Sequence, residues 1–402
     1  MNHARHFVLI TDTFSPLRNS GAIQLRDLSR EFVKRGYRLT VLVPVSGDVS
    51  AWSIEEVDGV EVVRLRSPMA KDVGHIRRTL AELIMPFAMR WNLLRSPVAK
   101  QMWDGIIWYS PSIFHGPLVK FLKHRNRCKT YLIVRDIFPD WARDMGLIGH
   151  GLPFLFFASV ARYQYSVADI IGVQTSGNLH YFQVWAGRAN RQLEVLPNWL
   201  GPIFGSGCPI NVSHTSLSGR SIFVYAGNMG VAQGMDILLD LAERLLPQLD
   251  IGFLFVGRGS DVSRLKLAVS VRKLTNIQFF DEIHPDEIPG LFAQCMAGIV
   301  TLDPRHKSHN IPGKFLTYMQ NGLPVLAVLN SGNDLSDLIR SEQVGQVCES
   351  THIGELLDCT FRLIKQIDED EGMSARCKVT FDKYFTVHGA VTQIAKALID
   401  AT

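Results

Sequence analysis

Apolar strands and helices alternate along this chain in two separate series, and this alternation restricts the fold more than any other feature. Residues 7–10 form an uninterrupted apolar run, which is typical of a strand buried on both faces. A loop with Pro16 and Gly21 follows, and Gly36 closes the helix that comes next. Repetition of this unit predicts an α/β fold built on doubly wound parallel sheets.

The two series are separated by residues 201–219, a segment rich in glycine, proline and polar residues. We therefore predict an N-terminal domain at 1–200 and a C-terminal domain at 201–379, with a helix at about 380–402 that packs back on the first. The predicted strands are residues 7–10, 39–43, 60–65, 106–109, 131–134, 170–173 and 193–196, and then 222–226, 253–256, 277–280, 298–302 and 325–328. Two Rossmann-like domains of this kind are expected to face a central cleft.

Composition fits an intracellular α/β protein. Hydrophobic residues make up 47% of the 402 residues, enough for a core in each domain, and no apolar run reaches the roughly 18 residues of a membrane span. Residues 1–6 do not resemble a signal peptide, so we expect a cytoplasmic location. The six cysteines show no paired spacing, which indicates reduced thiols and disfavours a zinc site.

Charge is distributed unevenly between the two halves. Residues 1–200 hold 25 Lys and Arg against 16 Asp and Glu, a net +9, and the remainder holds 17 against 22, a net −5. A basic first half indicates contact with an anionic surface or substrate. No nucleic-acid module accompanies the charge, so we expect no nucleic-acid partner.

Residues 76–94 combine an apolar stripe with flanking arginines, and Pro86 is expected to kink or split the helix. Such a pattern is typical of a helix lying on an anionic membrane surface. A core-facing helix with a solvated basic back fits the same pattern, and both interpretations stay open. The stripe consists of Ile76, Leu80, Leu83, Ile84, Phe87, Trp91 and Leu94.

Three glycine-containing turns mark the second series. The first contains Gly227 and the second Gly257, and the third leads into a helix predicted at 314–321, after Gly313 and before Gly322. Because the carboxyl ends of parallel strands meet at one edge of a sheet, these turns should lie together. Helix N-termini and Lys314 would favour phosphate there. Ordinary glycine-rich connections remain the alternative.

Charged residues follow a predicted buried strand of the first domain. Asp136 would project from the end of strand 131–134, where it could act as a base or orient an acceptor hydroxyl. Its neighbour Arg135 could hold a phosphate. A purely structural role for this segment, with Asp140 capping the next helix, stays open as well.

Several of these segments together resemble the GT-B glycosyltransferases of family 4, in the branch of O-antigen and capsule enzymes. The greatest similarity is to N-acetyl-L-fucosamine transferases of O-antigen assembly. The resemblance covers nearly the whole chain, and its specific elements are residues 227–234, with the pattern Gly-Asn-x-Gly-x-x-Gln-Gly, and residues 310–325. Weaker support comes from Gly21 and from residues 135–139, 168–170, 196–199 and 257–259.

This resemblance implies a nucleotide-sugar donor in the second domain, transfer with retained anomeric configuration, and no metal or other cofactor. Asp136 and Lys314 are the catalytic residues expected from it, with the leaving diphosphate stabilised by C-terminal groups. The expected donor-binding residues are Gly227, Asn228, Gly230, Gln233, Arg258, Gly259, His309, Gly313 and Thr317. The expected acceptor-binding residues are Gly21, Arg135 and His115.

Two departures from the family pattern bear on donor binding. His309 and Thr317 stand where many relatives carry two glutamates, so the usual ribose contact is in question. Asn228 and Gln233 stand where many relatives carry Arg and Lys, which leaves more of the diphosphate charge to Lys314.

The expected activity is therefore transfer of an amino sugar, with N-acetyl-L-fucosamine as the best candidate, from UDP to a polyprenyl-diphosphate-linked saccharide. The enzyme would work peripherally on the inner face of a bacterial cytoplasmic membrane, through its basic N-terminal domain. Two alternatives stay open: a nucleotide-sugar epimerase on the same fold, and a nonenzymatic nucleotide-binding protein. The missing dinucleotide fingerprint disfavours an NAD-dependent oxidoreductase.

Overall fold

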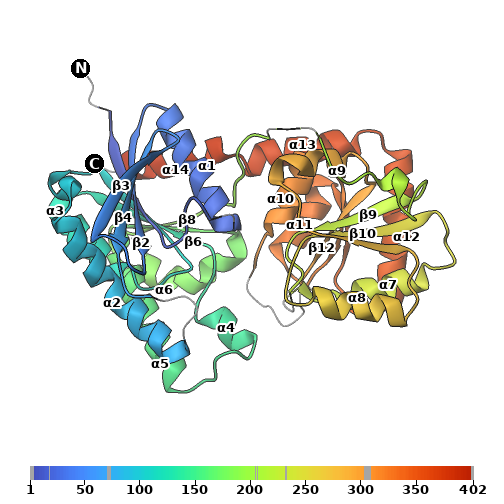
Figure 1. Cartoon of the computed structure of the whole chain (residues 1–402), viewed down its shortest axis with the longest axis horizontal. Coiled ribbons are helices and arrows are strands. Elements are labelled where there is room, and N and C mark those ends of the chain that lie inside the picture. The colour runs from blue at the N-terminus through green and yellow to red at the C-terminus, as the bar shows by residue number, and fades with distance from the viewer. Residues whose placement is uncertain are drawn as a thin grey trace. The chain divides into compact units, whose positions relative to one another are not determined.

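A computed structural model of the chain describes residues 4–17, 19–69, 74–203, 205, 207–230, 233–302 and 309–399. It divides into two compact units, one of Met1–Gly201 with Val387–Thr402 and the other of Pro202–Thr386 (Figure 1). Each unit contains one largely parallel sheet with packed helices, which confirms the α/β fold class. No helix in the described ranges is both long and apolar enough to span a bilayer.

The first unit holds a sheet of eight strands in the order β3-β4-β2-β1-β5-β6-β7-β8. The strands are β1 (His6–Ile10), β2 (Arg38–Val45), β3 (Trp52–Val57), β4 (Val60–Arg66), β5 (Gly105–Tyr109), β6 (Lys129–Val134), β7 (Ile170–Val173) and β8 (Gln192–Val195). The helices are α1 (Ser20–Lys34), α2 (His75–Leu94), α3 (Gly116–Asn126), α4 (Asp140–Asp144), α5 (Leu152–Val167), α6 (Gln183–Ala186) and α14 (Val387–Ile399), with 3₁₀ segments η1 (Pro97–Lys100) and η2 (Ser176–Phe182).

One edge of this sheet differs from the all-parallel prediction. β3 runs antiparallel to β4, and the pair is joined by Asp58 and Gly59, both at positive φ (55° and 77°). An Asp-Gly turn of this kind matches the twist of a hairpin. Apolar runs do not reveal β3, because the strand is polar and largely exposed at the sheet edge.

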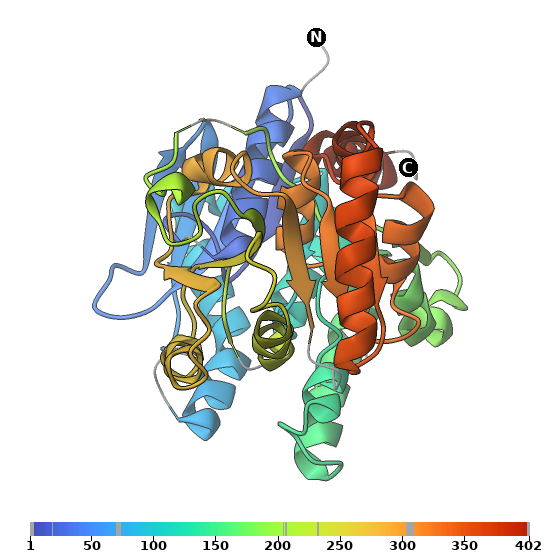
Figure 2. The ribbon, with the colours of Figure 1, turned by 90° about the vertical axis from the view of Figure 1, so that its right-hand side faces the viewer.

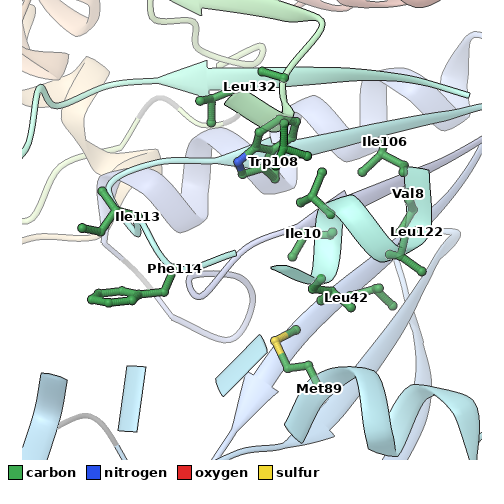
Figure 3. Close-up of a cluster of buried hydrophobic side chains, with 14 of the residues drawn as sticks. Val8, Ile10, Leu42, Met89, Ile106, Trp108, Ile113, Phe114, Leu122 and Leu132 are labelled. Carbon is green, nitrogen blue, oxygen red and sulfur yellow. The ribbon is translucent and has the colours of Figure 1, made fainter. Parts of the chain in front are cut away.

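Helices α2, α3 and α5 lie on one face of the sheet and bury a core against it. Figure 3 shows part of this core, with Met89 of α2 and Leu122 of α3 close to Ile10, Leu42 and Ile106 of the strands. Helices α1 and α14 pack on the opposite face. Apolar residues on both faces explain why the central strands read as continuous apolar runs.

The apolar stripe predicted on α2 points mostly outward. The core-facing side of α2 is instead formed by Met85, Met89 and Leu93, with Leu83 partly buried beside them. Pro86 lies inside one continuous helix, so it does not split α2 into two helices. The core-facing interpretation of the stripe is therefore wrong for six of its seven residues. Their exposed fractions are 78% for Ile76, 54% for Leu80, 52% for Ile84, 59% for Phe87, 61% for Trp91 and 44% for Leu94.

The second unit holds a six-stranded sheet in the order β11-β10-β9-β12-β13-β14, parallel throughout the described pairs. Figure 2 shows the long helix α12 lying along it. The strands are β9 (Ser221–Ala226), β10 (Ile251–Val256), β11 (Ile277–Phe280), β12 (Ala297–Thr301), β13 (Val325–Val328) and β14 (Gly345–Cys348). The helices are α7 (Asp236–Arg244), α8 (Val262–Val271), α9 (Ile288–Phe292), α10 (Gly313–Gln320), α11 (Asp334–Glu342), α12 (Ile353–Glu369) and α13 (Met373–Tyr384), with 3₁₀ segments η3 (Val212–His214) and η5 (Pro285–Glu287).

The boundary near the C-terminus lies later than the sequence indicates. Helix α14 returns to the first unit, where the Arg35 guanidinium donates to the His388 carbonyl at 2.6 Å and the Thr392 hydroxyl at 2.7 Å. Residues 380–386, predicted to return with it, belong to the second unit. The reason is packing, because α13 lies against α10 and the Phe385 ring contacts Phe315 at a centroid distance of 6.0 Å.

Candidate active site

Two of the glycine turns predicted in the second unit are interlocked at the carboxyl ends of neighbouring strands. Gly227 follows β9 and Gly257 follows β10, and the Gly227 amide donates to the Val256 carbonyl at 2.9 Å. A Cβ built on Gly257 would lie 2.0 Å from the Gly227 oxygen, and Gly257 has a φ of 143°. Only glycine fits there without a shift of backbone, so the residue type fixes how closely the two turns approach.

Helix α10 is held on the same sheet by a buried tyrosine. The Tyr318 hydroxyl lies 3.1 Å from the Val224 carbonyl of β9 and 3.3 Å from the Ile299 carbonyl of β12, and it accepts from the Ala226 amide at 3.2 Å. Its ring packs where a Cβ on Gly298 would come within 2.6 Å. Since residues four apart share a helix face, Tyr318 also aims Lys314 at the carboxyl edge of β9.

Lys314 lies at the meeting point of the first turn and α10. Its Nζ atom donates to Gln233 Oε1 at 3.1 Å and lies 3.6 Å from the centroid of the Tyr225 ring. The Tyr225 hydroxyl in turn donates to the Asn228 carbonyl at 2.7 Å. Cβ on Gly227 would lie 3.7 Å from Lys314 Cε, so the expected convergence of Gly227, Gly257 and α10 on one edge is confirmed.

This lysine has no counter-ion among the described residues, where Gln233 and the Tyr225 ring are its polar neighbours. Burial lowers the pKa of Lys314 well below its ordinary value, because removing an ammonium from water disfavours the charged form. An anion placed beside it would oppose that effect. The arrangement can therefore neutralise a diphosphate, aided by the amide groups at the start of α10.

Other predicted donor-binding residues lie near this edge with protein partners of their own. Arg258 forms an exposed ion pair with Glu282 at 3.1 Å, and His309 Nδ1 lies 3.1 Å from an Asp334 oxygen. The Thr317 hydroxyl donates to the Gly313 carbonyl within α10 at 3.0 Å. A donor would have to rearrange or share these contacts, and the assigned roles stay predictions.

Gly230 and Gly259 belong to the same pair of turns. A Cβ on Gly259 would lie 2.1 Å from the Met229 oxygen, whereas on Gly230 it would meet the Asn228 amide nitrogen at 3.0 Å. Gly259 is therefore required by backbone packing, and Gly230 leaves room for the Asn228 side chain. Their contact with a donor stays a prediction.

Three of the predicted residues of the first unit, Gly21, Arg135 and Asp136, lie near Tyr109, which the sequence did not single out. Gly21 is in the first turn of α1 rather than in a loop, since Asn19 caps the helix by accepting from the Ala22 amide at 2.9 Å. Cβ on Gly21 would lie 3.4 Å from the Tyr109 hydroxyl oxygen. Burial raises the pKa of Tyr109 to about 12, opposed by Arg135 and reinforced by Asp136.

Arg135 is buried and already engaged by main-chain oxygens. Its guanidinium donates to the Leu196 carbonyl at 2.8 Å and lies 4.5 Å above the Trp199 ring. Burial lowers the pKa of Arg135, with Tyr109 acting in the opposite direction. These contacts favour a role in positioning Asp136 and Tyr109 over direct phosphate binding, and acceptor contact by Arg135 stays a prediction.

His115 is fully buried at the start of α3. Neither of its ring nitrogens has a hydrogen-bond partner among the described residues, although its main-chain amide donates to Gln164 Oε1 at 3.1 Å. Burial lowers its pKa, and Asp12 acts in the opposite direction. A neutral imidazole with unused donor and acceptor capacity is compatible with the predicted acceptor contact.

Potential metal ligands do not gather in the described part of the chain, where no three or more His, Cys, Asp or Glu residues group together. That transfer needs no metal or other cofactor stays a prediction.

Comparison with known proteins identifies the class of this chain. Residues 220–366, which span β9 to α12, match the family described as "Glycosyl transferases group 1". A protein of Escherichia coli (strain K12) named as a colanic acid biosynthesis glycosyl transferase, WcaI, is 24% identical over 316 residues, which cover 76% of this chain and 74% of that protein.

Solved structures match over nearly the full length. Sucrose-phosphate synthase from Thermosynechococcus elongatus superposes with a TM-score of 0.74 at 14% identity, covering 99% of this chain and 100% of that one. Anabaena Alr3699/HepE, in complex with UDP and glucose, superposes with a TM-score of 0.68 at 15% identity. The match covers 97% of this chain and 98% of that one. The fold is GT-B, and the chain is a glycosyltransferase with a group 1 domain. The epimerase alternative gains no support from these matches.

Proposed function

We propose that this glycosyltransferase transfers an amino sugar from a UDP donor to a polyprenyl-diphosphate-linked saccharide in the assembly of an O-antigen or capsule. Lys314 carries the proposal, as a desolvated amine without a described counter-ion at the rim of the second sheet, where a bound diphosphate would favour its charged form. The name of the E. coli relative refers to colanic acid biosynthesis, and Anabaena HepE forms a complex with UDP and glucose. Both are consistent with this donor and pathway class.

The proposed transfer retains the anomeric configuration. The bond between the anomeric carbon and the β-phosphate oxygen breaks, and UDP leaves with the electron pair. The acceptor hydroxyl oxygen forms the new bond to that carbon and loses its proton. Lys314 and the amides of α10 would stabilise the charge on the departing diphosphate, and Asp136 would orient or deprotonate the acceptor hydroxyl.

The first unit is proposed to lie on an anionic bilayer. Helices α2, α3 and α5 together carry seven Lys and Arg residues and a single acid, Glu82, which pairs with Arg78 at 2.9 Å. Six apolar side chains of α2 are exposed among these charges. Exposed apolar groups with arginines are suited to the headgroup region of a membrane.

The experiment is a transfer assay with purified full-length protein, a lipid-linked acceptor and a panel of UDP-amino sugars that includes UDP-N-acetyl-L-fucosamine. We expect acceptor-dependent release of UDP and a product one sugar longer. UDP-sugar conversion without acceptor would favour the epimerase, and no turnover with any donor of the panel would contradict the proposal. We propose N-acetyl-L-fucosamine as the transferred sugar, and the turnover of its UDP derivative relative to the other donors of the panel tests this choice.

A further inference from the structure

A pocket in the first unit has no function assigned to it so far. It has a volume of about 470 Å³, within the range of small-molecule sites, and is lined by residues of α4, α5, η2 and α6 and of the loops beside them. Ile137 and Phe138, which come shortly after β6, form one wall. The pocket therefore begins one residue beyond Asp136, at the carboxyl edge of the sheet where ligands of this fold class bind.

The lining is apolar, and its few polar atoms are largely occupied. Eleven of the fifteen lining residues are apolar or aromatic, including Phe138, Phe154, Tyr165, Tyr181, Phe182 and Trp185. The Trp185 indole donates to the Tyr165 carbonyl at 2.7 Å, and the Ser166 hydroxyl donates to the Tyr163 carbonyl at 2.6 Å. Apart from the two arginines of the lining, few partners remain for the hydroxyl groups of a saccharide, and burying those groups unpaired would be unfavourable.

Two arginines line the same pocket. The Arg162 Nε group donates to the Ala158 carbonyl of its own helix at 3.2 Å, and neither Arg162 nor Arg188 forms an ion pair with a described residue. The acid of the lining, Asp140, is paired with Arg143 at 3.1 Å. Charge at the rim therefore favours an anionic group next to an apolar chain.

The surface around the pocket is unusually apolar as well. Val184 of the lining is 88% exposed, and Leu147, Leu152 and Leu155 nearby in α5 and the loop before it are 68%, 81% and 53% exposed. Exposed apolar side chains on the elements that line a pocket are suited to contact with another apolar body, such as a lipid.

We propose that this pocket binds the first isoprene units of the polyprenyl-diphosphate acceptor, with Arg162 and Arg188 contacting the diphosphate. The inference rests on the proposed function, because it assigns the lipid part of the same acceptor. Aromatic and aliphatic walls would bury the isoprenoid, and the two arginines would hold the phosphates.

The test is calorimetric titration of the full chain with three ligands. They are farnesyl diphosphate, which is a soluble isoprenyl diphosphate, inorganic diphosphate, and a saccharide glycoside without a lipid. We expect farnesyl diphosphate to bind at least tenfold more tightly than inorganic diphosphate. Ala158→Trp places a large side chain in the pocket from α5 and should reduce the affinity for farnesyl diphosphate at least tenfold. Ser159→Trp, an exposed neighbour on the same helix, is the matched control and should leave binding unchanged.

Equal binding of farnesyl and inorganic diphosphate would overturn the inference. So would an unaltered affinity in a folded Ala158→Trp protein, or competition by the saccharide glycoside. The double variant Arg162→Gln with Arg188→Gln should bind farnesyl diphosphate more weakly but should bind farnesol, which lacks the diphosphate, as the wild type does. An equal loss of affinity for both ligands would contradict the assignment of the arginines to the diphosphate. Binding without transfer would refute the proposed function alone, whereas transfer with a KM for lipid acceptor unaffected by Ala158→Trp would refute the pocket alone.

Discussion

Lys314 is the residue on which, in our proposal, the chemistry of the second unit depends. Tyr225, Gln233 and Tyr318 determine its environment, yet these residues lie up to about ninety positions from it in sequence. Helical spacing and glycine turns predicted the edge at which Lys314 lies. They could not predict the tyrosine contacts, because which side chain a ring meets depends on tertiary packing.

Nucleotide binding should take up protons at Lys314. Burial lowers its pKa in the free protein, and a bound diphosphate would raise it again. Since the bound state then holds more protons, affinity for UDP should fall as the pH rises through the free-protein pKa of Lys314. Titration calorimetry in buffers of different ionisation enthalpy measures the uptake. Lys314→Arg is the control. Because its guanidinium stays charged with and without UDP, this variant should lack the proton uptake that Lys314 contributes on binding.

Among the elements, the turns after β9 and β10 impose the closest backbone approach at the site. The sequence predicted both turns from their glycines but not which glycine is indispensable. Gly257 abuts the Gly227 carbonyl, whereas Gly354 in α12 has open space around its Cβ position. Sequence spacing does not show which of these glycines could be replaced by a larger residue, because that depends on the atoms packed around each one.

Gly257→Ala should destabilise the second unit by more than about 1 kcal/mol and weaken UDP binding, because the new methyl would collide with the Gly227 oxygen. Gly354→Ala should be neutral or stabilise by up to about 1 kcal/mol. Chemical denaturation followed by circular dichroism measures both changes. Equal stability of the two variants would contradict the interlocked turns.

Helix α2 was the hardest element to orient from sequence, since apolar residues cover most of its circumference. Periodicity predicted one stripe, containing Phe87 and Trp91, and left open whether it faces the core or a membrane. In the structure that stripe is exposed, and Met85 and Met89, which lie outside it, face the core. The adjacent Arg95 guanidinium lies 4.6 Å over the Trp91 ring. Together these groups form the membrane-facing side that we propose.

Phe87→Glu with Trp91→Glu should reduce binding to phosphatidylglycerol vesicles about tenfold or more, since it removes apolar area and adds like charge. Co-sedimentation measures the loss. Leu267→Glu, at an exposed position (65%) of α8 in the second unit, is the control and should have no effect. Unchanged sedimentation of the double variant would count against the α2 face.

The chain as a whole is two sheets of one kind connected at Gly201 and again before α14. Runs rich in apolar residues predicted, to within about two residues, twelve of the fourteen strands found in the described part of the chain. The two exceptions, β3 and β14, are edge strands with polar or mixed faces, so no buried run marks them. The candidate site of the second unit followed from topology, while the aromatic pocket beside α5 did not, because its lining combines three separate segments, 137–140, 154–166 and 181–188.

The central claim is that the carboxyl edge of the second sheet binds the diphosphate of a UDP-sugar through Lys314. Titration calorimetry of UDP with wild type, Lys314→Met and Lys266→Met tests it most directly, with Lys266 on α8 as the matched lysine. Loss of a charge-assisted contact of about 1.5–3 kcal/mol predicts an affinity reduced about ten- to a hundredfold in Lys314→Met and unchanged in Lys266→Met. Equal affinities for UDP in all three proteins would contradict the account.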